Sequence, residues 1–310
     1  MTDVPDSTPA EYHQPVLVEE IGRLSAHARR VVDGTLGDGG HAEMFLSHGS
    51  SVLAIDRDPG AIERARQRLG GAAITYMEGR YSDPAILEAV RQFRPDFVLL
   101  DLGVSSRQLD QESRGFTFRP GAPLDMRMGD AGLTGADLLN TLDETALRTI
   151  FAEYGDERRA GALARQVLHR RGSRPFATSD DLVNAIRAVL GASSGPAEFA
   201  RLFQALRIAV NDELEGLSTA LPAYREAITP VGTVAVISYH SGEDRIVKHL
   251  FQDWARRCVC PPRQPICTCR GRPLGSMDPR KPILPTAAEI ALNPRARSAR
   301  LRVFRVSDAV

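Results

Sequence analysis

The chain has 310 residues, of which 43% are hydrophobic and 25% are charged, and its 39 basic and 39 acidic residues cancel. This balance is typical of a globular protein and excludes a disordered tail, a collagen-like repeat and a small disulfide scaffold. No apolar run approaches the roughly 18 residues that a membrane span needs, and the polar N-terminus lacks the pattern of a secretion signal. We therefore expect a cytoplasmic protein without a membrane partner.

The charge is unevenly distributed along the chain. Between Arg256 and Arg305 there are 12 Lys or Arg residues against two acidic ones, so this segment carries +10 and the remainder −10. A local basic segment on a neutral protein favours contact with phosphate groups. On charge alone, a solvated surface without a partner is the simpler interpretation.

Short apolar runs alternate with helical patterns over the first hundred residues. Strands are predicted at 30–36, 51–56, 73–77 and 96–101. Helices are predicted at 41–48, 60–69 and 84–93. Strands joined by single helices imply right-handed crossovers and a parallel sheet. The apolar run Phe97–Leu100 favours a strand that is buried on both faces.

This alternation stops after the fourth strand. Residues 103–135 indicate a long ordered loop, and no strand is predicted at 105–195. Helices are predicted at 144–154, 157–171, 179–190 and 199–228, followed by a strand at 233–239, a helix at 243–256 and a strand at 300–306. The pattern predicts an α/β sheet domain, residues 1–105 and 200–310, interrupted by a loop and helical insert at 106–199.

A glycine-rich turn, Asp33-Gly-Thr-Leu-Gly-Asp-Gly-Gly-His41, follows the first predicted strand. Glycine lets the backbone approach a ligand closely at the carboxyl ends of strands, where doubly wound sheets bind nucleotides. Asp56 ends the second strand, where a carboxylate can accept the hydroxyls of a ribose. The pattern therefore predicts a nucleoside cofactor.

Two cofactors compete for this turn. An NAD-dependent oxidoreductase also uses a glycine-rich turn and an acidic residue at the end of the second strand. The carboxylate of Asp33 would repel a pyrophosphate, whereas it suits the amino-acid end of S-adenosylmethionine (SAM). The spacing therefore favours SAM over NAD. A third interpretation is an RNA-binding protein with a vestigial cofactor pocket.

The fourth predicted strand ends at Asp101, and a polar segment follows it. An exocyclic amine that is conjugated with its ring is a poor nucleophile, so its attack needs a hydrogen-bond acceptor. Asp101 is a candidate for this role or for binding the cofactor. The alternative is an aspartate that caps a turn.

Taken together, these segments resemble the RsmH (MraW) family of 16S rRNA cytosine-N4 methyltransferases over nearly the whole chain. The motifs, in the order expected for that family, are HQPVL (13–17), DGTLGDGGH (33–41), AIDRDP (54–59), DLGVSSRQLD (101–110), RGF (114–116), LDMRM (124–128), FQALRIAVNDEL (203–214), SYHSGEDRIVK (238–248) and NPRARSARLR (293–302).

The resemblance implies a Rossmann-like class I SAM-dependent methyltransferase fold with an inserted all-helical domain for substrate recognition. It implies N4-methylation of cytidine 1402, in the decoding (P-site) region of 16S rRNA, within the assembled small ribosomal subunit. It also implies SAM contacts from Gly39, Gly40, His41, Asp56, Tyr81, Asp101 and Gln108. The oligomeric state is left open, with a homodimer as one alternative.

Methyl transfer to a cytosine requires the base to be splayed out of its stack. Phe116, Phe118 and Tyr239 are candidate stacking surfaces, although aromatic side chains more often lie in a core. Besides Asp101, the candidate catalytic residues are His240, which could hold the base or accept a proton, and Asp125.

Apart from Tyr81 and Tyr239, which stand where the family usually has Phe, the chain departs from the family pattern in two places. Residues 197–202 keep Arg201 but not its expected neighbours, which weakens any prediction of substrate contacts there. Gly242 stands where a leucine is expected after His240 and Ser241.

The four cysteines of the chain, Cys258, Cys260, Cys267 and Cys269, lie within 12 residues. Four thiolates so close together allow a tetrahedral zinc site. The C-x-C spacing, however, makes a more strained chelate than C-x-x-C, and the family resemblance implies no required metal. We therefore expect no metal, with structural zinc as the less favoured alternative.

Overall fold

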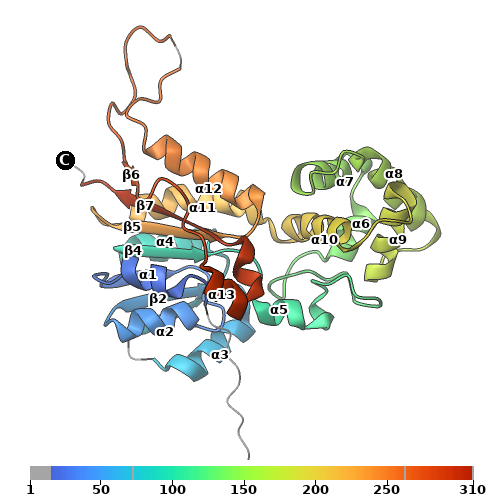
Figure 1. Ribbon diagram of the computed structural model, residues 1–310, viewed down its shortest axis with the longest axis horizontal. Coiled ribbons are helices and arrows are strands. Elements are labelled where there is room, and N and C mark those ends of the chain that lie inside the picture. The colour runs from blue at the N-terminus through green and yellow to red at the C-terminus, as the bar shows by residue number, and fades with distance from the viewer. Residues whose placement is uncertain (1–14, 72, 262, 309–310) are drawn as a thin grey trace, which may run out of the picture. The chain divides into compact units, whose positions relative to one another are not determined.

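The computed structural model describes residues 15–71, 73–261 and 263–308 (Figure 1). His13 and Gln14 of the first family motif lie outside the described residues. The chain divides into two compact units. Unit 1 holds the chain up to Asp101, Tyr224–Ser238 and the chain from Phe251 onward, and unit 2 holds Leu102–Ala223 and Tyr239–Leu250. The predicted insert at 106–199 lies within unit 2, and its role in substrate recognition stays a prediction.

Unit 1 is built on a seven-stranded sheet in the order β3-β2-β1-β4-β5-β7-β6. The strands are β1 (Arg30–Asp33), β2 (Ser51–Asp56), β3 (Ile74–Glu78), β4 (Phe97–Asp101), β5 (Thr233–Ser238), β6 (Gly275–Met277) and β7 (Arg300–Val306). The strands from β3 to β5 are parallel, whereas β7 runs antiparallel between β5 and β6. This order confirms the predicted Rossmann-like α/β fold.

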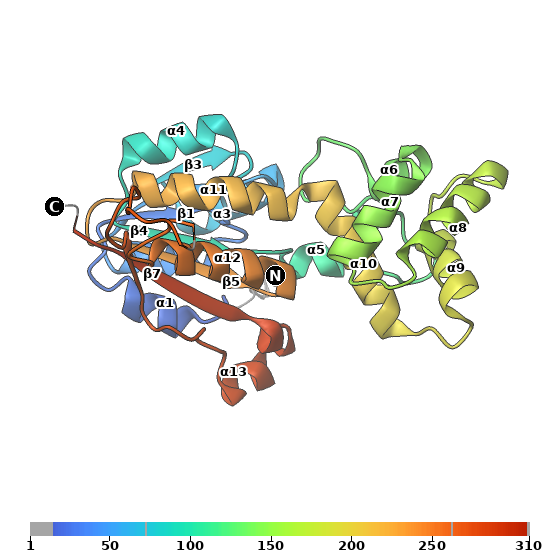
Figure 2. The same ribbon diagram turned by 90° about the horizontal axis from the view of Figure 1, so that it is seen from above.

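Helices cover the sheet of unit 1 on both faces. They include α1 (Val18–Leu24), α2 (Gly40–Ser47), α3 (Pro59–Leu69) and α4 (Pro84–Phe93), whereas α13 (Ala287–Leu292) has no buried residue and packs against the turn Pro294–Ser298. Helix α2 packs on β1 and β2, α3 packs on β2 and β3, and α1 and α4 lie on opposite faces of the sheet (Figure 2). Consistent with this cover, all six residues of β5 are buried.

The C-terminal strand is anchored by a cluster of aromatic side chains. The rings of Phe251, Trp254 and Phe304 lie 5.3–5.4 Å apart, centroid to centroid. Phe251 and Phe304 are fully buried. Such tilted and edge-to-face pairs stabilise a core beyond the area that they bury.

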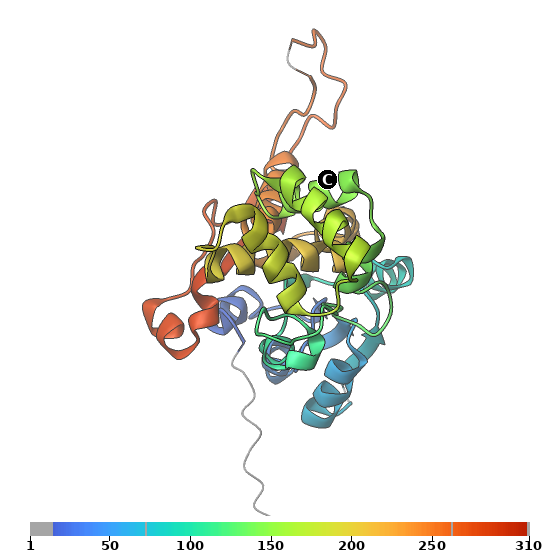
Figure 3. The ribbon, with the colours of Figure 1, turned by 90° about the vertical axis from the view of Figure 1, so that its right-hand side faces the viewer.

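Unit 2 is helical, and Figure 3 shows its green and yellow helices from the front. Its helices are α5 (Ser106–Asp110), α6 (Gly135–Thr141), α7 (Glu144–Thr149), which continues as a π-helical turn (Ile150–Tyr154), α8 (Ala160–Ser173), α9 (Ser179–Leu190) and α10 (Pro196–Asn211). Helices α11 (Glu213–Ala227) and α12 (Ser241–Trp254) begin in this unit. Leu139, Leu163, Leu182 and Leu202 are fully buried in a core of its own.

The structure corrects one predicted helix and adds several short elements. The prediction of one continuous helix at 199–228 is wrong, because α10 ends at Asn211 and a separate helix, α11, begins at Glu213. Asp212 between them adopts a left-handed conformation with φ of 51°, which ends α10. Residues 105–195, all of them described, contain no strand, as predicted. The elements without a sequence prediction, α1, α5, α6, α13 and β6, are seven residues long or shorter.

No helix within the described ranges combines the length and the apolar character that crossing a bilayer requires.

Candidate functional site

The glycine-rich turn of unit 1 connects β1 to the first residue of α2. Gly37 has a φ of +54°, and a Cβ built on it meets no atom of the described chain within 4 Å. Gly39 has a φ of +83°, and a Cβ there would lie 2.8 Å from the side chain of Leu69. Glycine is therefore favoured at Gly39 mainly by its left-handed backbone, whereas at Gly37 it also leaves the backbone open to a ligand.

Asp33 ends β1 with a carboxyl that is 1% exposed. Its Oδ1 accepts a hydrogen bond from the N–H of Thr35 at 3.3 Å, whereas the buried Oδ2 has no hydrogen-bond partner among the described residues. The pKa of Asp33 is raised to about 6 because the carboxyl is buried. The charge of His41 and the hydrogen bond from the Thr35 N–H lower this pKa but do not outweigh the effect of burial. A buried carboxylate oxygen without a partner is a site where a cation of the ligand can bind.

Asp56 ends β2 beside the same turn. Its Oδ2 accepts a hydrogen bond from the N–H of Gly37 at 2.8 Å, and its Oδ1 accepts one from the N–H of Asp58 at 2.9 Å. Burial raises the pKa of this carboxyl, and the two N–H bonds oppose that rise. Asp56 is thus fixed against the glycine turn, and each of its oxygens has a further lone pair for a ribose hydroxyl.

His41 and Asp101 complete the carboxyl end of the sheet. His41 is the second residue of α2, and its Nε2 lies 3.6 Å from Oδ2 of Asp101, too far for a hydrogen bond. Both ring nitrogens of His41 are buried, and neither has a hydrogen-bond partner within the described chain. Asp101 is held by its own N–H, which donates to the Thr35 hydroxyl at 2.6 Å.

Tyr81 follows β3 in a turn that Asp83 caps. The Arg80 N–H donates to Oδ2 of Asp83 at 2.7 Å, and the carbonyl of Tyr81 accepts a hydrogen bond from the buried Tyr224 hydroxyl at 3.0 Å. Six of the seven predicted cofactor residues therefore belong to unit 1, in the segments that follow β1, β2, β3 and β4.

The seventh predicted cofactor residue, Gln108, belongs to unit 2. It forms a capping box at the start of α5, in which its Oε1 accepts the Ser105 N–H at 3.0 Å. Its Nε2 donates to the Met128 carbonyl at 3.2 Å. Gln108 thus joins α5 to the LDMRM segment, and its contact with a cofactor stays a prediction.

Asp125 lies in the LDMRM segment and is engaged by Arg127. Its carboxylate accepts bonds from Arg127 Nε at 2.9 Å and Nη2 at 2.8 Å. Burial raises the pKa of Asp125, but the bonds from Arg127 outweigh this effect and hold the pKa below its usual value. A carboxylate with a lowered pKa is a poor proton acceptor, which favours a positioning role for Asp125.

The LDMRM segment is fastened to the end of α10 by the buried side chain of Asn211. Its Nδ2 donates to the carbonyls of Met126 at 2.7 Å and Arg207 at 2.9 Å, and its Oδ1 accepts the Met128 N–H at 3.0 Å. Met126 has a φ of +64°, a conformation that these bonds help to hold. Sequence reasoning missed Asn211, although its polarity within an apolar helical stripe was a signal.

His240 lies in a buried network of charges. Its Nδ1 accepts the Glu243 N–H at 3.4 Å, and its Nε2 lies 3.1 Å from Oε1 of Glu243 without hydrogen-bond alignment. Burial raises the pKa of Glu243, but the bonds to His240 and the charge of Arg207 hold it below its usual value. Arg207 also makes two bonds of 2.9 Å to Glu213. His240 is therefore held beside Glu243, whose carboxylate is itself balanced by the partly buried Arg207.

At the two places where the chain departs from the family pattern, the retained Arg201 and the glycine at 242 both have local structural roles. Arg201 pairs with the buried Glu157 at 2.5 Å and donates to the Gly155 carbonyl, so it fixes the turn before α8. A Cβ at Gly242 would lie 3.1 Å from Nδ1 of His240. The glycine at 242 therefore gives His240 room that a larger side chain would take.

Of the candidate stacking residues, Phe118 packs in the core of unit 2. Its ring lies 5.9 Å from Phe199 and 6.0 Å from Phe203, centroid to centroid, with steep angles. Phe116 packs against the same core, and Tyr239 is partly exposed. Phe116 and Phe118 are therefore partly buried against this core, and the ring contacts of Phe118 favour a structural role for it.

Similarity to known proteins extends over nearly the whole chain. The model of the MraW methylase family matches residues 10–307. The chain is 56% identical over 306 residues to the ribosomal RNA small subunit methyltransferase H of Gemmatimonas aurantiaca, covering 97% of each chain. It is 43% identical over 310 residues to the protein of that name from Rubrobacter xylanophilus, covering 96% of this chain and 97% of the relative. A third relative of that name, from Heliobacterium mobile, is 42% identical over 94% of this chain and 98% of its own. The chain therefore belongs to the MraW methylase family.

Proposed function

We propose that this protein methylates the RNA of the small ribosomal subunit with SAM as the methyl donor, and that its target is the N4 amine of cytidine 1402 in 16S rRNA. The observation that carries the proposal is the arrangement of Asp33, His41, Asp56 and Asp101 around one open glycine turn, in a chain of the MraW methylase family. The names of the relatives support the small-subunit substrate.

The residues at the turn fit SAM. The unpaired Oδ2 of Asp33 suits the α-ammonium group, and the two lone pairs left on Asp56 suit the ribose hydroxyls. The open face of Gly37 allows the backbone to lie against the ligand. When bound, SAM supplies an electrophilic methyl group together with its own leaving group.

The same turn argues against NAD. A pyrophosphate at this turn would meet the carboxyl of Asp33, which is ionised in most molecules at neutral pH because its pKa is about 6. Two anions in a buried site repel each other strongly. A zwitterionic amino-acid group offers Asp33 an ammonium partner instead, so the charge of this one residue discriminates between the two cofactors.

The exocyclic amine of cytosine loses one proton when it gains a methyl group. We propose that Asp101 accepts a hydrogen bond from this amine and so restores lone-pair character to the nitrogen. The backbone of Asp101 is fixed by the bond from its N–H to the Thr35 hydroxyl, which places the carboxylate at the end of β4 and supports its use in orienting the amine. For Asp125 and His240 we propose positioning roles, since Arg127 and Glu243 respectively engage them.

We propose that the substrate is the assembled small subunit in the cytoplasm, because the target nucleotide belongs to the decoding region. The helical unit 2 and the basic segment 256–305 are the proposed RNA-contacting parts. The oligomeric state is left open, with a homodimer as one alternative.

The test is nucleoside mass spectrometry of 16S rRNA from cells with and without the gene. Mutant subunits are then incubated with the purified protein and SAM, and RNA fragments are mapped. We expect N4-methylcytidine at position 1402 to disappear on deletion and to return on incubation. Methylation of naked 16S rRNA but not of the assembled subunits would overturn the proposed subunit substrate. A different methylated nucleoside would overturn the N4 assignment. An unchanged modification pattern would refute the whole proposal.

A further inference from the structure

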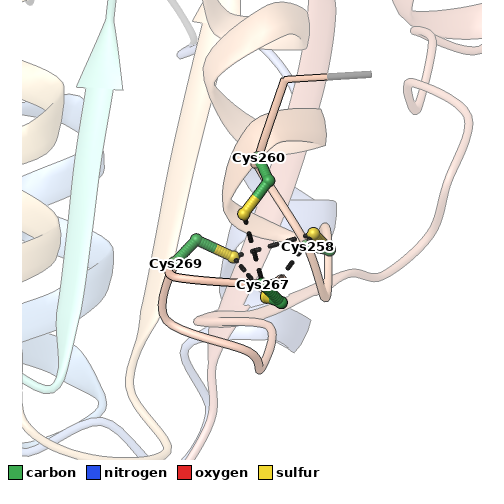
Figure 4. Close-up of side chains that lie close together, drawn as sticks. All are labelled: Cys258, Cys260, Cys267 and Cys269. Atoms are coloured by element: carbon green, nitrogen blue, oxygen red, sulfur yellow. Dashed lines mark hydrogen bonds between the residues drawn. The ribbon is translucent and has the colours of Figure 1, made fainter. Parts of the chain in front are cut away.

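All four cysteines meet in one loop of unit 1, outside the site described above. The loop runs from residue 256 to residue 274, between α12 and β6. Figure 4 shows the four side chains directing their sulfur atoms toward one another from two stretches of this loop. All four Sγ atoms lie within 4.8 Å of one another.

The distances between the sulfur atoms match those of a tetrahedral metal site. Cys267 Sγ lies 3.8 Å from the sulfur atoms of Cys258 and Cys260 and 3.4 Å from that of Cys269, which is 3.8 Å from Cys258. Four thiolates at the Zn–S distance of about 2.3 Å have neighbouring sulfurs about 3.8 Å apart. A disulfide would require about 2.05 Å, so the separation of the sulfurs is that of ligands around one ion.

The loop has no hydrophobic core that could explain this convergence. None of its described residues from 256 to 274 is buried, and Ile266 is 75% exposed. It also contains neither helix nor strand in its described part. Ordering so long a segment costs conformational entropy, which apolar burial does not offset here. A bound metal ion supplies the missing stabilisation in small segments of this kind.

The remaining contacts of the loop suit a metal site. The Val259 N–H donates to Sγ of Cys269 at 3.3 Å, a bond that stabilises a thiolate. Gln264 closes the tip with bonds to the Ile266 carbonyl at 2.9 Å and the Thr268 hydroxyl at 2.8 Å. The base is fastened by the Leu274 N–H, which donates to the Trp254 carbonyl at 2.8 Å.

The charge of the loop complements a zinc–thiolate centre. One Zn²⁺ with four thiolates carries a net charge of −2, by simple addition of charges. The loop holds no acidic residue and five arginines, Arg256, Arg257, Arg263, Arg270 and Arg272. These cations favour the thiolate form of the cysteines and offset the charge of the centre.

We propose that Cys258, Cys260, Cys267 and Cys269 bind one structural Zn²⁺ ion, which holds this arginine-rich loop in a fixed conformation. Zinc is favoured among metals because it takes four thiolates in tetrahedral geometry without redox chemistry. With all four positions filled by protein ligands, the ion has no open position for catalysis. The proposal does not depend on the substrate of the enzyme.

The second cluster of potential ligands, Glu213, His240 and Glu243, is a weaker candidate for the metal. Their ligand atoms also lie within 4.8 Å of one another. The guanidinium of Arg207, however, already pairs with Glu213 at 2.9 Å and supplies a positive charge there. The cysteine cluster includes no such internal cation among its ligands.

The experiment measures metal content in untagged protein that is expressed with zinc and purified under reducing conditions. Inductively coupled plasma mass spectrometry should find one zinc ion per chain. The double variant Cys258→Ser/Cys269→Ser should lose it, whereas the control Ile266→Ser, at an exposed position beside Cys267, should keep it. Substitution with Co²⁺ should give the intense visible absorption of a tetrahedral thiolate site in the wild type and not in the double variant.

Metal-free protein that also fails to take up Zn²⁺ in a titration would overturn the proposal. Metal retained by the double variant and lost in Glu243→Gln would place the ion at the second cluster instead, and iron in place of zinc would overturn the choice of metal. Limited trypsin digestion tests the structural role. Removal of zinc should accelerate cleavage after Arg263, and an unchanged rate would refute that role. Circular dichroism should show that the double variant stays folded, because these cysteines lie outside the core.

Discussion

Asp33 gives the cofactor site a dependence on pH. Its pKa of about 6 in the free protein exceeds the ordinary value of 3.8 because the carboxyl is buried. An ammonium group bound to Asp33 favours the ionised form, so binding SAM below pH 6 must release a proton. We expect the affinity for SAM to fall about tenfold for each pH unit below about 6 and to be level above it.

Calorimetric titrations in buffers with different ionisation enthalpies measure both the affinity and the released proton. Asp33→Asn should bind weakly at every pH and release no proton. The matched control is Asp38→Asn in the same turn, whose carboxylate pairs with Arg64 at 2.8 Å and should leave the pH profile intact. A wild-type affinity that stays level from pH 5 to pH 7 would contradict the role of Asp33.

The same carboxyl makes the free protein less stable at neutral pH. Because the pKa of Asp33 is raised in the folded state, its contribution to folding is fully present below about pH 3.8 and is lost as the pH rises through about 6. The shift of the pKa from 3.8 to about 6 corresponds to a free energy of unfolding that is roughly 3 kcal/mol lower at neutral pH than in acid. We expect Asp33→Asn to increase the free energy of unfolding at pH 7 by roughly 2 kcal/mol, measured by urea denaturation without cofactor. A decrease in that free energy would count against the buried, unpaired carboxylate.

Asp101 should matter more for the rate than for binding of the cofactor. Asp101→Asn keeps the shape of the side chain and the backbone bond to Thr35 but removes the negative charge. We expect the methylation rate at saturating SAM to fall roughly 10²-fold. The control is Glu88→Gln on α4, an exposed carboxylate that should leave the rate unchanged. Equal losses in rate and in SAM affinity would make Asp101 a cofactor ligand only.

At the residue scale, the sequence predicted well where the glycine turn and the strand-end carboxylates lie, because both follow simple local rules. Asp33 and Asp56 end adjacent strands, and a parallel sheet necessarily brings such ends together. The partners of Asp125 and His240 were not predictable. Glu243 and Arg127 are short-range contacts whose geometry depends on how the local backbone turns, and spacing alone leaves that turn undefined.

Among the elements, the end of α10 fixes two parts of unit 2 at once. Asn211 bonds to Met126 and Met128, while Arg207, one turn earlier, pairs with Glu213. Asn211→Ala removes all three side-chain bonds of the asparagine. We expect a loss of roughly 2–4 kcal/mol in the free energy of unfolding, because backbone groups of the LDMRM segment lose their buried partner.

Hydrogen exchange should localise this loss of protection to residues 124–128. The control Ser218→Ala removes an exposed hydroxyl that bonds to the Leu214 carbonyl within α11 and should change stability by less than about 0.5 kcal/mol. Unchanged exchange at 124–128 in Asn211→Ala would show that other contacts hold the segment.

The break between α10 and α11 shows what apolar periodicity cannot predict. Phe203, Leu206 and Val210 precede the break, and Leu217 and Leu221 follow it with nearly the same spacing. The apolar pattern therefore continues, although the backbone of Asp212 adopts the left-handed conformation that ends α10. A single aspartate is a weak sequence signal for this conformation, because most aspartates adopt other backbone angles.

The molecule as a whole contains two separate hydrophobic cores. Leu182 is fully buried in the core of unit 2, and Leu182→Ala should cost roughly 2–5 kcal/mol. We expect faster hydrogen exchange in unit 2 and weaker rRNA methylation, with a much smaller change in SAM affinity. Val98→Ala in β4 should instead increase hydrogen exchange in unit 1 and lower the affinity for SAM, because Val98 is fully buried in the sheet of that unit. Loss of protection over both units in Leu182→Ala would show that they unfold as one.

The position of β7 makes completion of the sheet a long-range step of folding. This strand pairs with β5 on one side and with β6 on the other, and it brings Phe304 into the aromatic cluster. Its partner β5 lies far from it along the chain, so a large loop must close before these two strands can meet. Because pairing between distant segments is slow, we expect this edge of the sheet to form after the local crossovers between β1, β2 and β3.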